Sequence, residues 1–248
     1  MKNRFISVSF ILSFAVFASC SQGVDKIDIK MGAEQIANIA SSYMKAEKYQ
    51  YAGEVFMEVD RLHRYSDTAR KSLINASRAF HASGDYEMCR LAANRFIEDF
   101  PESRDADQAK YLIGLCYYEQ IPDVSRDQRP AKEALREFTE LIEKYPSSKL
   151  IPQAKEKFDE ALTQIAGQEV VIGNFYLEKD QVLAALGRYK VVVDNYAMTP
   201  YVEEAIFRVF ECYTLLGLTD KSVKYYRKLE RSYPNSDWLE KAKNIKSF

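Results

Sequence analysis

The sequence predicts an all-α fold, a right-handed superhelical solenoid of about five helix hairpins. One pattern of residues recurs five times along the chain, which is the signature of a repeat protein. Gly (9) and Pro (7) are scarce among the 248 residues, which disfavours a turn-rich β fold. The apolar fraction of 47% is high enough for a sizeable core. We therefore expect one continuous stack of helices.

Each copy of the pattern has the same parts. A helical stretch ends in an aromatic residue, a polar turn follows, and then come a small residue and an apolar or aromatic residue four positions later. The small residues are Ala52, Cys89, Ala134, Ala185 and Ser222. The second, third and fifth copies end in Phe100-Pro101, Tyr145-Pro146 and Tyr233-Pro234, whereas the fourth has Tyr196-Ala197 and the first lacks the proline. The aromatic stripe is interpreted as core.

This pattern is typical of tetratricopeptide-like repeats. The small residue lets two helices approach closely, and the proline ends a helix because it cannot continue one. A single hairpin cannot bury its apolar face, so neighbouring hairpins must stack. The predicted domain covers residues 32–248, with approximate repeats at 33–66, 70–103, 107–148, 153–199 and 203–237. The longer spacings are assigned to a loop at 121–127 and to a long helix from Gln153 to about Leu177.

The first nineteen residues are predicted to be a lipoprotein signal peptide. Lys2 and Arg4 precede an apolar stretch, Phe5 to Phe17, that is too short to span a bilayer. Ala18-Ser19-Cys20 resembles a bacterial lipobox, although Phe17 stands where Leu is usual. Cys20 is therefore the expected lipidation site, and residues 20–31 are the expected tether. The alternative is ordinary signal cleavage, with Cys20 incidental.

The composition argues against several functions. The 35 basic and 36 acidic residues include no basic run, so nothing favours nucleic acid. Two histidines, His63 and His81, are too few for a histidine-based metal site, and neither lies in a nucleophile motif. The sequence has no glycine-rich phosphate loop. We expect no enzymatic activity, no metal and no cofactor.

Three cysteines lie in the predicted repeat domain. Cys89 occupies a small-residue position, and Cys116 and Cys212 each precede the tyrosine that closes a first helix. We favour small buried thiols over a disulfide for these residues.

Two stretches carry a resemblance to a known family. The first is Ser125-Arg126-Asp127 and the helix after it, running into Tyr145-Pro146. The second contains the aromatic pair Phe175-Tyr176 and an alanine-rich segment that ends in Arg188. Together with the lipobox and five irregular repeats, these stretches resemble the BamD (ComL-like) family over nearly all of the mature chain. The chain departs from the family pattern at two further places. Ala197 stands where the family has proline, and Lys179-Asp180 stands where it has Arg-Gly.

The resemblance implies a scaffold of the outer-membrane β-barrel assembly machine. Such lipoproteins lie on the periplasmic face of the outer membrane, held by a lipid anchor. They bind the POTRA domains of the BamA barrel protein and other Bam lipoproteins, and they help to deliver unfolded outer membrane proteins. Ser21 after the lipidated cysteine also resembles the outer-membrane class. The alternative is another envelope repeat scaffold, either pilotin-like or a peptidoglycan-synthesis coordinator. An enzyme with a solenoid domain, such as a lytic transglycosylase, would need a separate catalytic domain.

The resemblance also suggests binding residues. Arg188 matches the arginine that contacts BamA, and its alternative role is that of a solvated helix residue. A client groove is expected on the first helices of the N-terminal hairpins, flanked by the loop at 121–130. Its candidate residues are Lys71, Asn75, Arg78, Tyr111 and Tyr118. The alternative is that both tyrosines pack between helices and both cations are merely solvated.

Overall fold

The computed structural model describes residues 27–245, and within them it contains eleven helices and no strand. Cys20 and the predicted signal peptide lie outside the described residues. The helices are α1 (Ala33–Lys45), α2 (Tyr49–Leu62), α3 (Asp67–Ser83), α4 (Tyr86–Asp99), α5 (Ala106–Tyr118), α6 (Arg129–Lys144), α7 (Ile151–Glu178), α8 (Val182–Asn195), α9 (Val202–Leu215), α10 (Thr219–Ser232) and α11 (Asp237–Ile245).

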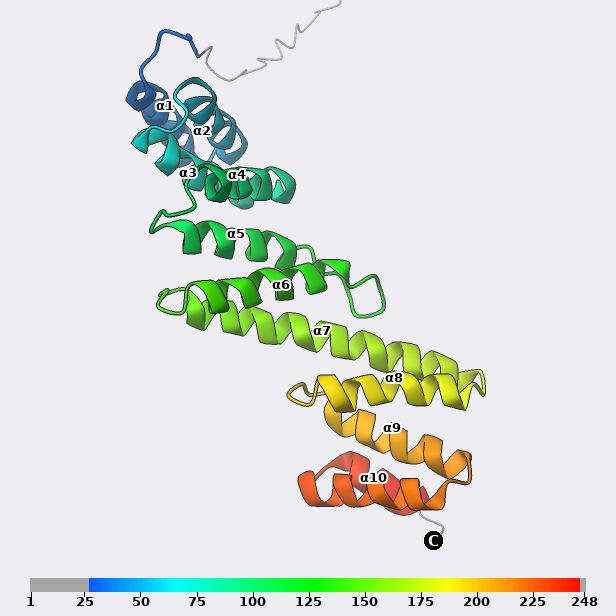
Figure 1. Cartoon of the computed structure of the whole chain (residues 1–248). Coiled ribbons are helices and arrows are strands. Elements are labelled where there is room, and N and C mark those ends of the chain that lie inside the picture. The colour runs from blue at the N-terminus through cyan, green and yellow to red at the C-terminus, as the bar shows by residue number, and fades with distance from the viewer. Residues whose placement is uncertain (1–26, 246–248) are drawn as a thin grey trace, which may run out of the picture.

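Consecutive helices form five hairpins, from α1–α2 to α9–α10, and α11 packs against the last one. Figure 1 shows the hairpins stacked in chain order, so that the two ends of the described chain lie at opposite ends of the stack. The predicted all-α stack of hairpins is confirmed. The sequence pattern had not indicated α11 as a separate helix.

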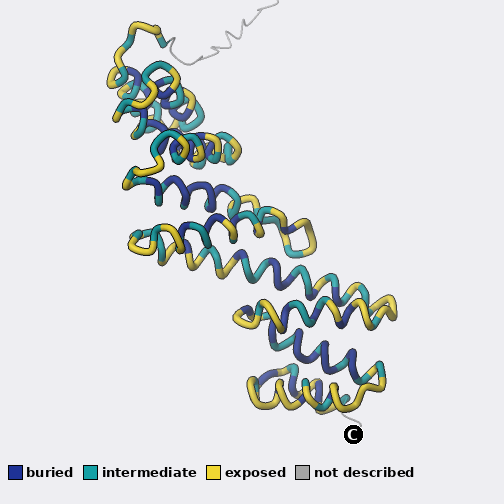
Figure 2. The backbone as a smooth tube through the Cα atoms, in the orientation of Figure 1, coloured by how far each residue is buried: buried dark blue, intermediate teal, exposed yellow. Residues whose placement is uncertain are grey.

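The small residues of the repeat pattern lie where helices meet. All five are buried, with exposed fractions of 1% or less. Large aromatic side chains, among them Phe80, Phe138 and Tyr189, fill the space beside them and are fully buried, as expected for a core stripe. The buried stretches follow the helix–helix contacts along the whole stack (Figure 2). Each hairpin therefore completes its core with the next one.

Helix α7 gives the stack its irregular shape. Its 28 residues confirm the expected long helix, and it packs against both α6 and α8. The loop before α6 is held by Gln128, whose buried amide donates to the carbonyl of Asp123 at 2.9 Å. Gln168 of α7 also donates to the carbonyl of Arg126 at 2.6 Å. The inserted loop is thus fastened to the neighbouring long helix.

The preference for free thiols at Cys89 and Cys116 is wrong. These residues form a disulfide between α4 and α5, with Cα atoms 6.8 Å apart. Cys89 points across the hairpin boundary because the small-residue position of α4 faces the first helix of the next hairpin. Residue spacing within one repeat contains no information about that contact. Cys212 is a buried free thiol, as expected.

Candidate functional site

The predicted groove residues lie on α3 and α5, two first helices of neighbouring hairpins. Lys71, Asn75 and Arg78 follow each other at helical spacing and therefore share one face of α3. Tyr111 and Tyr118 share one face of α5 for the same reason. The guanidinium of Arg78 donates to the side-chain oxygen of Gln108 on α5 and to that of Asn75. The structure thus brings the α3 and α5 faces side by side.

The two tyrosines have different surroundings. Tyr111 is half-buried, its ring centroid lies 6.1 Å from that of Phe138, and burial raises its pKa. Tyr118 is also half-buried, but its hydroxyl donates to Glu160 on α7 and accepts from Lys157. The Lys157 ammonium lies 4.5 Å from the Tyr118 ring centroid. Tyr118 is therefore part of a polar cluster between α5 and α7.

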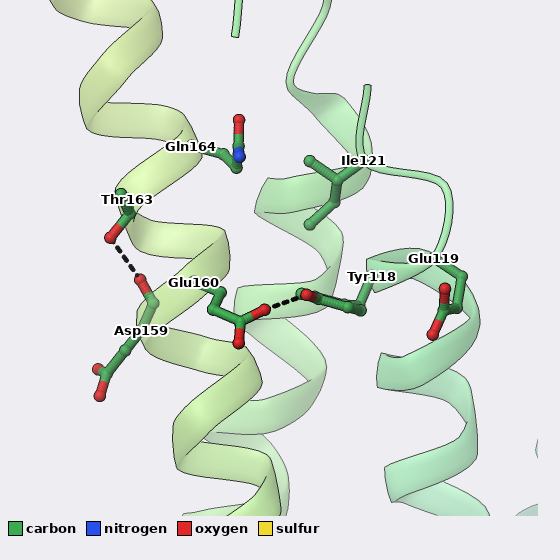
Figure 3. Close-up of a pocket in the computed structure, with 7 residues that line it drawn as sticks. All are labelled: Tyr118, Glu119, Ile121, Asp159, Glu160, Thr163 and Gln164. Atoms are coloured by element: carbon green, nitrogen blue, oxygen red, sulfur yellow. Dashed lines mark hydrogen bonds between the residues drawn. The ribbon is translucent and has the colours of Figure 1, made fainter. Parts of the chain in front are cut away.

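A cavity of about 490 Å³ opens beside Tyr118. Its lining residues are Tyr118, Glu119, Ile121, Asp159, Glu160, Thr163 and Gln164. Figure 3 shows Tyr118 and Glu160 pointing toward each other, with Ile121 and Gln164 near them. The hydrogen bond from Tyr118 and the nearby Lys157 lower the pKa of Glu160. Sequence reasoning selected Tyr118 but missed Asp159 and Glu160, because they come from a helix some forty residues later. It also did not single out Glu119, which directly follows Tyr118.

The two cations of the predicted groove form no ion pair with a carboxylate of the described residues. Lys71 is exposed and forms no ion pair within residues 27–245, and both hydrogen-bond partners of Arg78 are neutral amides. Gln108 also donates to Asp105, a carboxylate that is already paired with Arg70. The α3 side of the predicted groove therefore carries two cations, Lys71 and Arg78, without a paired carboxylate.

Arg188 lies on α8, outside the predicted groove. Its Nη1 atom is 3.1 Å from Oε2 of Glu169 on α7, and its side chain remains 42% exposed. The same hairpin exposes three large apolar side chains, Val171 (38%), Phe175 (55%) and Leu183 (71%). The hairpin α7–α8 thus combines an accessible guanidinium with exposed apolar groups, a composition common at protein interfaces. Sequence reasoning had not predicted Glu169 as a partner.

The described chain contains no candidate metal site and no candidate membrane span. Within residues 27–245, no group of three His, Cys, Asp or Glu side chains is placed to hold a metal ion. None of the helices in this range combines the length and apolar character needed to cross a membrane.

Comparison with known proteins identifies the family. Residues 30–229 match the family model described as "YfiO: Outer membrane lipoprotein". The chain belongs to the YfiO family. It is 32% identical over 227 residues to the outer membrane protein assembly factor BamD of Rickettsia prowazekii, which covers 92% of this chain and 90% of that protein. It is 30% identical over 236 residues to BamD of Caulobacter vibrioides, at 94% and 77% coverage.

The predicted resemblance to BamD is therefore confirmed, and the other envelope scaffolds considered from the sequence are not favoured. Among solved structures, the YfiO chain is similar to the TPR2AB domain of yeast Sti1, with a TM-score of 0.42 and 16% identity. That likeness covers 86% of this chain and 82% of the other.

Proposed function

We propose that this YfiO chain is an outer membrane protein assembly factor that acts as a scaffold without catalysis. The observation that carries the proposal is the family match over residues 30–229, together with relatives named as assembly factors. Stacked hairpins suit this role because they present long, rigid surfaces to several proteins. In our proposal, one surface binds POTRA domains of a BamA-like barrel protein and another binds unfolded outer membrane proteins.

The direct test is affinity purification of the full-length tagged protein from detergent-extracted membranes. We expect a BamA-like barrel protein and further lipoproteins to co-purify. A tagged outer membrane lipoprotein of unrelated fold is the control. Recovery of a secretin or a peptidoglycan synthase without any barrel protein would contradict the proposal.

The proposed anchor is a lipid on Cys20, at the periplasmic face of the outer membrane. The support is the Ala18-Ser19-Cys20 motif and the family description as an outer membrane lipoprotein. The disulfide between Cys89 and Cys116 agrees with an oxidising compartment outside the cytosol. Several acyl chains would hold the domain on the membrane, because each buried CH₂ contributes about 0.8 kcal/mol.

The proposed contact for the barrel protein is the α7–α8 hairpin around Arg188. An arginine offers two parallel N–H donors to a carboxylate, which gives both attraction and orientation. The exposed side chains of Phe175 and Leu183 would add apolar area to the same contact.

The proposed client site is the groove formed by Lys71, Asn75, Arg78, Tyr111 and Tyr118. Unpaired cations attract the carboxylate end of an extended peptide. The tyrosine rings offer apolar faces, and the Tyr118 hydroxyl keeps polar partners in Glu160 and Lys157.

A further inference from the structure

The outward side of α10 carries a group of basic side chains, which we call the basic face. Its members are Lys221, Lys224, Arg227 and Lys228, and their spacings of three and four residues place them on one side of the helix. All four are exposed, whereas the buried residues of α10 lie on the opposite side. Asp220 is the acidic residue beside them, so the net charge of this side is positive.

The cations of the basic face are not paired with carboxylates. Lys224, Arg227 and Lys228 form no ion pair with residues 27–245. The ammonium of Lys221 lies 5.6 Å from the ring centroid of Tyr213 and also forms no ion pair in this range. On α6, by contrast, exposed cations pair with glutamates of the same helix. The positive charge of α10 is therefore available to an anionic group outside the chain.

Two large apolar side chains adjoin the basic face. Leu215 at the end of α9 is 62% exposed, and Leu218, directly before α10, is 42% exposed. Both belong to the turn that leads into α10, one helical turn before Lys221. Helices that lie in a membrane surface combine basic residues with apolar side chains in this way, because the cations meet headgroups and the apolar groups enter the acyl boundary.

The shape of the surface fits an extended partner better than a small anion. The hollow over the basic face has a volume of about 690 Å³ and is lined only by residues of α10. Helix α10 packs against α9, with α11 beside it, at the end of the stack opposite α1 (Figure 1). No second helix encloses the cations. Mixed charges would suffice to keep a terminal face soluble, so an excess of one sign favours an anionic partner.

We propose that the basic face of α10 binds the anionic headgroups of a phospholipid membrane surface, with Leu215 and Leu218 entering its apolar boundary. The helix then lies on the membrane with its buried side turned toward α9. Polybasic helices are attracted to anionic lipids in this way, and the attraction weakens as salt screens it.

The binding has a consequence for the orientation of the stack. The proposed lipid on Cys20 would hold the α1 end at the membrane, and α10 lies at the other end (Figure 1). Neighbouring helix axes are about 8–10 Å apart, so nine steps from α1 to α10 give up to about 90 Å. Attachment at both ends would lay the solenoid along the membrane. This orientation rests on the proposed anchor, whereas the binding of α10 does not.

The test is energy transfer from α10 to the membrane in full-length protein reconstituted into vesicles. A donor dye is attached through Ser232→Cys, an exposed position at the end of α10, and the vesicles contain an acceptor-labelled lipid. One vesicle type is phosphatidylcholine alone, and the other also contains phosphatidylglycerol. We expect at least twofold higher transfer with phosphatidylglycerol. Raising the salt from about 0.1 M to 1 M should remove the difference, because the Debye length falls from about 10 Å to 3 Å.

The decisive variant combines Lys224→Gln, Arg227→Gln and Lys228→Gln in the donor-labelled protein. It should lower the transfer to the level seen with phosphatidylcholine alone. Its thermal unfolding should match that of the wild type, because all three side chains are exposed and unpaired. The matched control combines Lys132→Gln, Lys149→Gln and Lys155→Gln, three exposed lysines of the middle hairpins, and should keep the full difference.

The outcomes separate the basic face from the anchor. Vesicle flotation shows whether the chain is anchored: a chain without a lipid should not float with phosphatidylcholine, but its basic face should still make it float with phosphatidylglycerol. Equal transfer in both vesicle types would overturn the proposal, and so would an equal loss in both triple variants. If the α10 variant keeps its transfer but loses a co-purifying protein, the basic face binds an acidic protein surface and the membrane proposal is wrong.

Discussion

The guanidinium of Arg188 on α8 is 3.1 Å from the carboxylate of Glu169 on α7. The residue proposed to bind a partner's carboxylate thus has a carboxylate partner in its own chain. Because the Arg188 side chain is 42% exposed, this ion pair contributes only about 0.2–1 kcal/mol to stability. Glu169 therefore orients the guanidinium without burying it, and further donors of Arg188 remain available for a partner.

Arg188→Glu should weaken binding to the BamA-like partner at least tenfold, because it places two carboxylates against each other and removes the donor. The melting temperature should change by only a few degrees, since the ion pair is exposed. Co-purification and thermal unfolding measure the two effects. Arg231→Glu, an exposed reversal on α10, is the matched control. Unchanged co-purification of the Arg188 variant would contradict the proposed contact.

Cys20 should carry the lipid anchor. Metabolic labelling with a fatty-acid analogue is expected to tag the wild type and not Cys20→Ser, because the thiol is the acylation site. Cys212→Ser is the control, since that thiol is buried inside the α9 core and should not affect labelling. Equal labelling of wild type and Cys20→Ser would exclude this anchor.

The disulfide between Cys89 and Cys116 should stabilise the fold measurably. It joins positions 27 residues apart, and closing a loop of that length corresponds to roughly 3–4 kcal/mol in the chain-entropy model. Urea unfolding with and without reductant should reveal a loss of this order. Cys89→Ala with Cys116→Ala should remove the sensitivity to reductant, whereas Cys212→Ala should retain it. A wild type that unfolds identically under both conditions would argue against the bond.

The disulfide also shows what the sequence could and could not predict. The hairpins and the long α7 were predictable because small residues, aromatics and prolines recur within each repeat. Contacts between repeats depend on how one hairpin is rotated against the next, and spacing does not encode that rotation. For this reason the Cys89–Cys116 pair and the Glu160 partner of Tyr118 required the structure. The Glu169 partner of Arg188 lies within one hairpin, and it depends on how α7 and α8 pack together.

Acid should destabilise the protein through Glu140. Hydrogen bonds from Lys110 and Lys144 lower the pKa of Glu140 from 4.5 to about 2. Desolvation acts in the opposite direction, but its effect on the pKa is smaller. A lowered pKa means that the stabilisation is present above pH 4.5 and is lost as the pH falls toward 2. Its size is on the order of 2 kcal/mol, since one pKa unit corresponds to about 1.4 kcal/mol and partial exposure screens the interaction.

The measurement is the difference in unfolding free energy between wild type and Glu140→Gln across pH 2–6. This difference should shrink as the pH falls. Comparison with the variant is necessary because burial raises the pKa of Asp60. The titration of Asp60 therefore changes the unfolding free energy with pH in the direction opposite to that of Glu140. The Asp60 effect is common to both proteins and cancels. A difference that does not change with pH would contradict the role of Glu140.

Two glycines of the α7–α8 hairpin should respond in opposite ways to the same substitution. A Cβ atom on Gly173 would lie 2.5 Å from the ring of Tyr189, whereas a Cβ atom on Gly187 would meet no atom within 4 Å. Tyr189 is fully buried and its hydroxyl donates to Asn174 at 2.6 Å, so its ring has little freedom to move. Gly173→Ala should therefore cost about 1–3 kcal/mol through overpacking. Gly187→Ala should stabilise the helix by up to about 1 kcal/mol, because alanine loses less backbone entropy than glycine. Urea unfolding of both variants measures the two changes in unfolding free energy. Equal changes would contradict the conclusion that close packing against Tyr189 makes a side chain at position 173 destabilising.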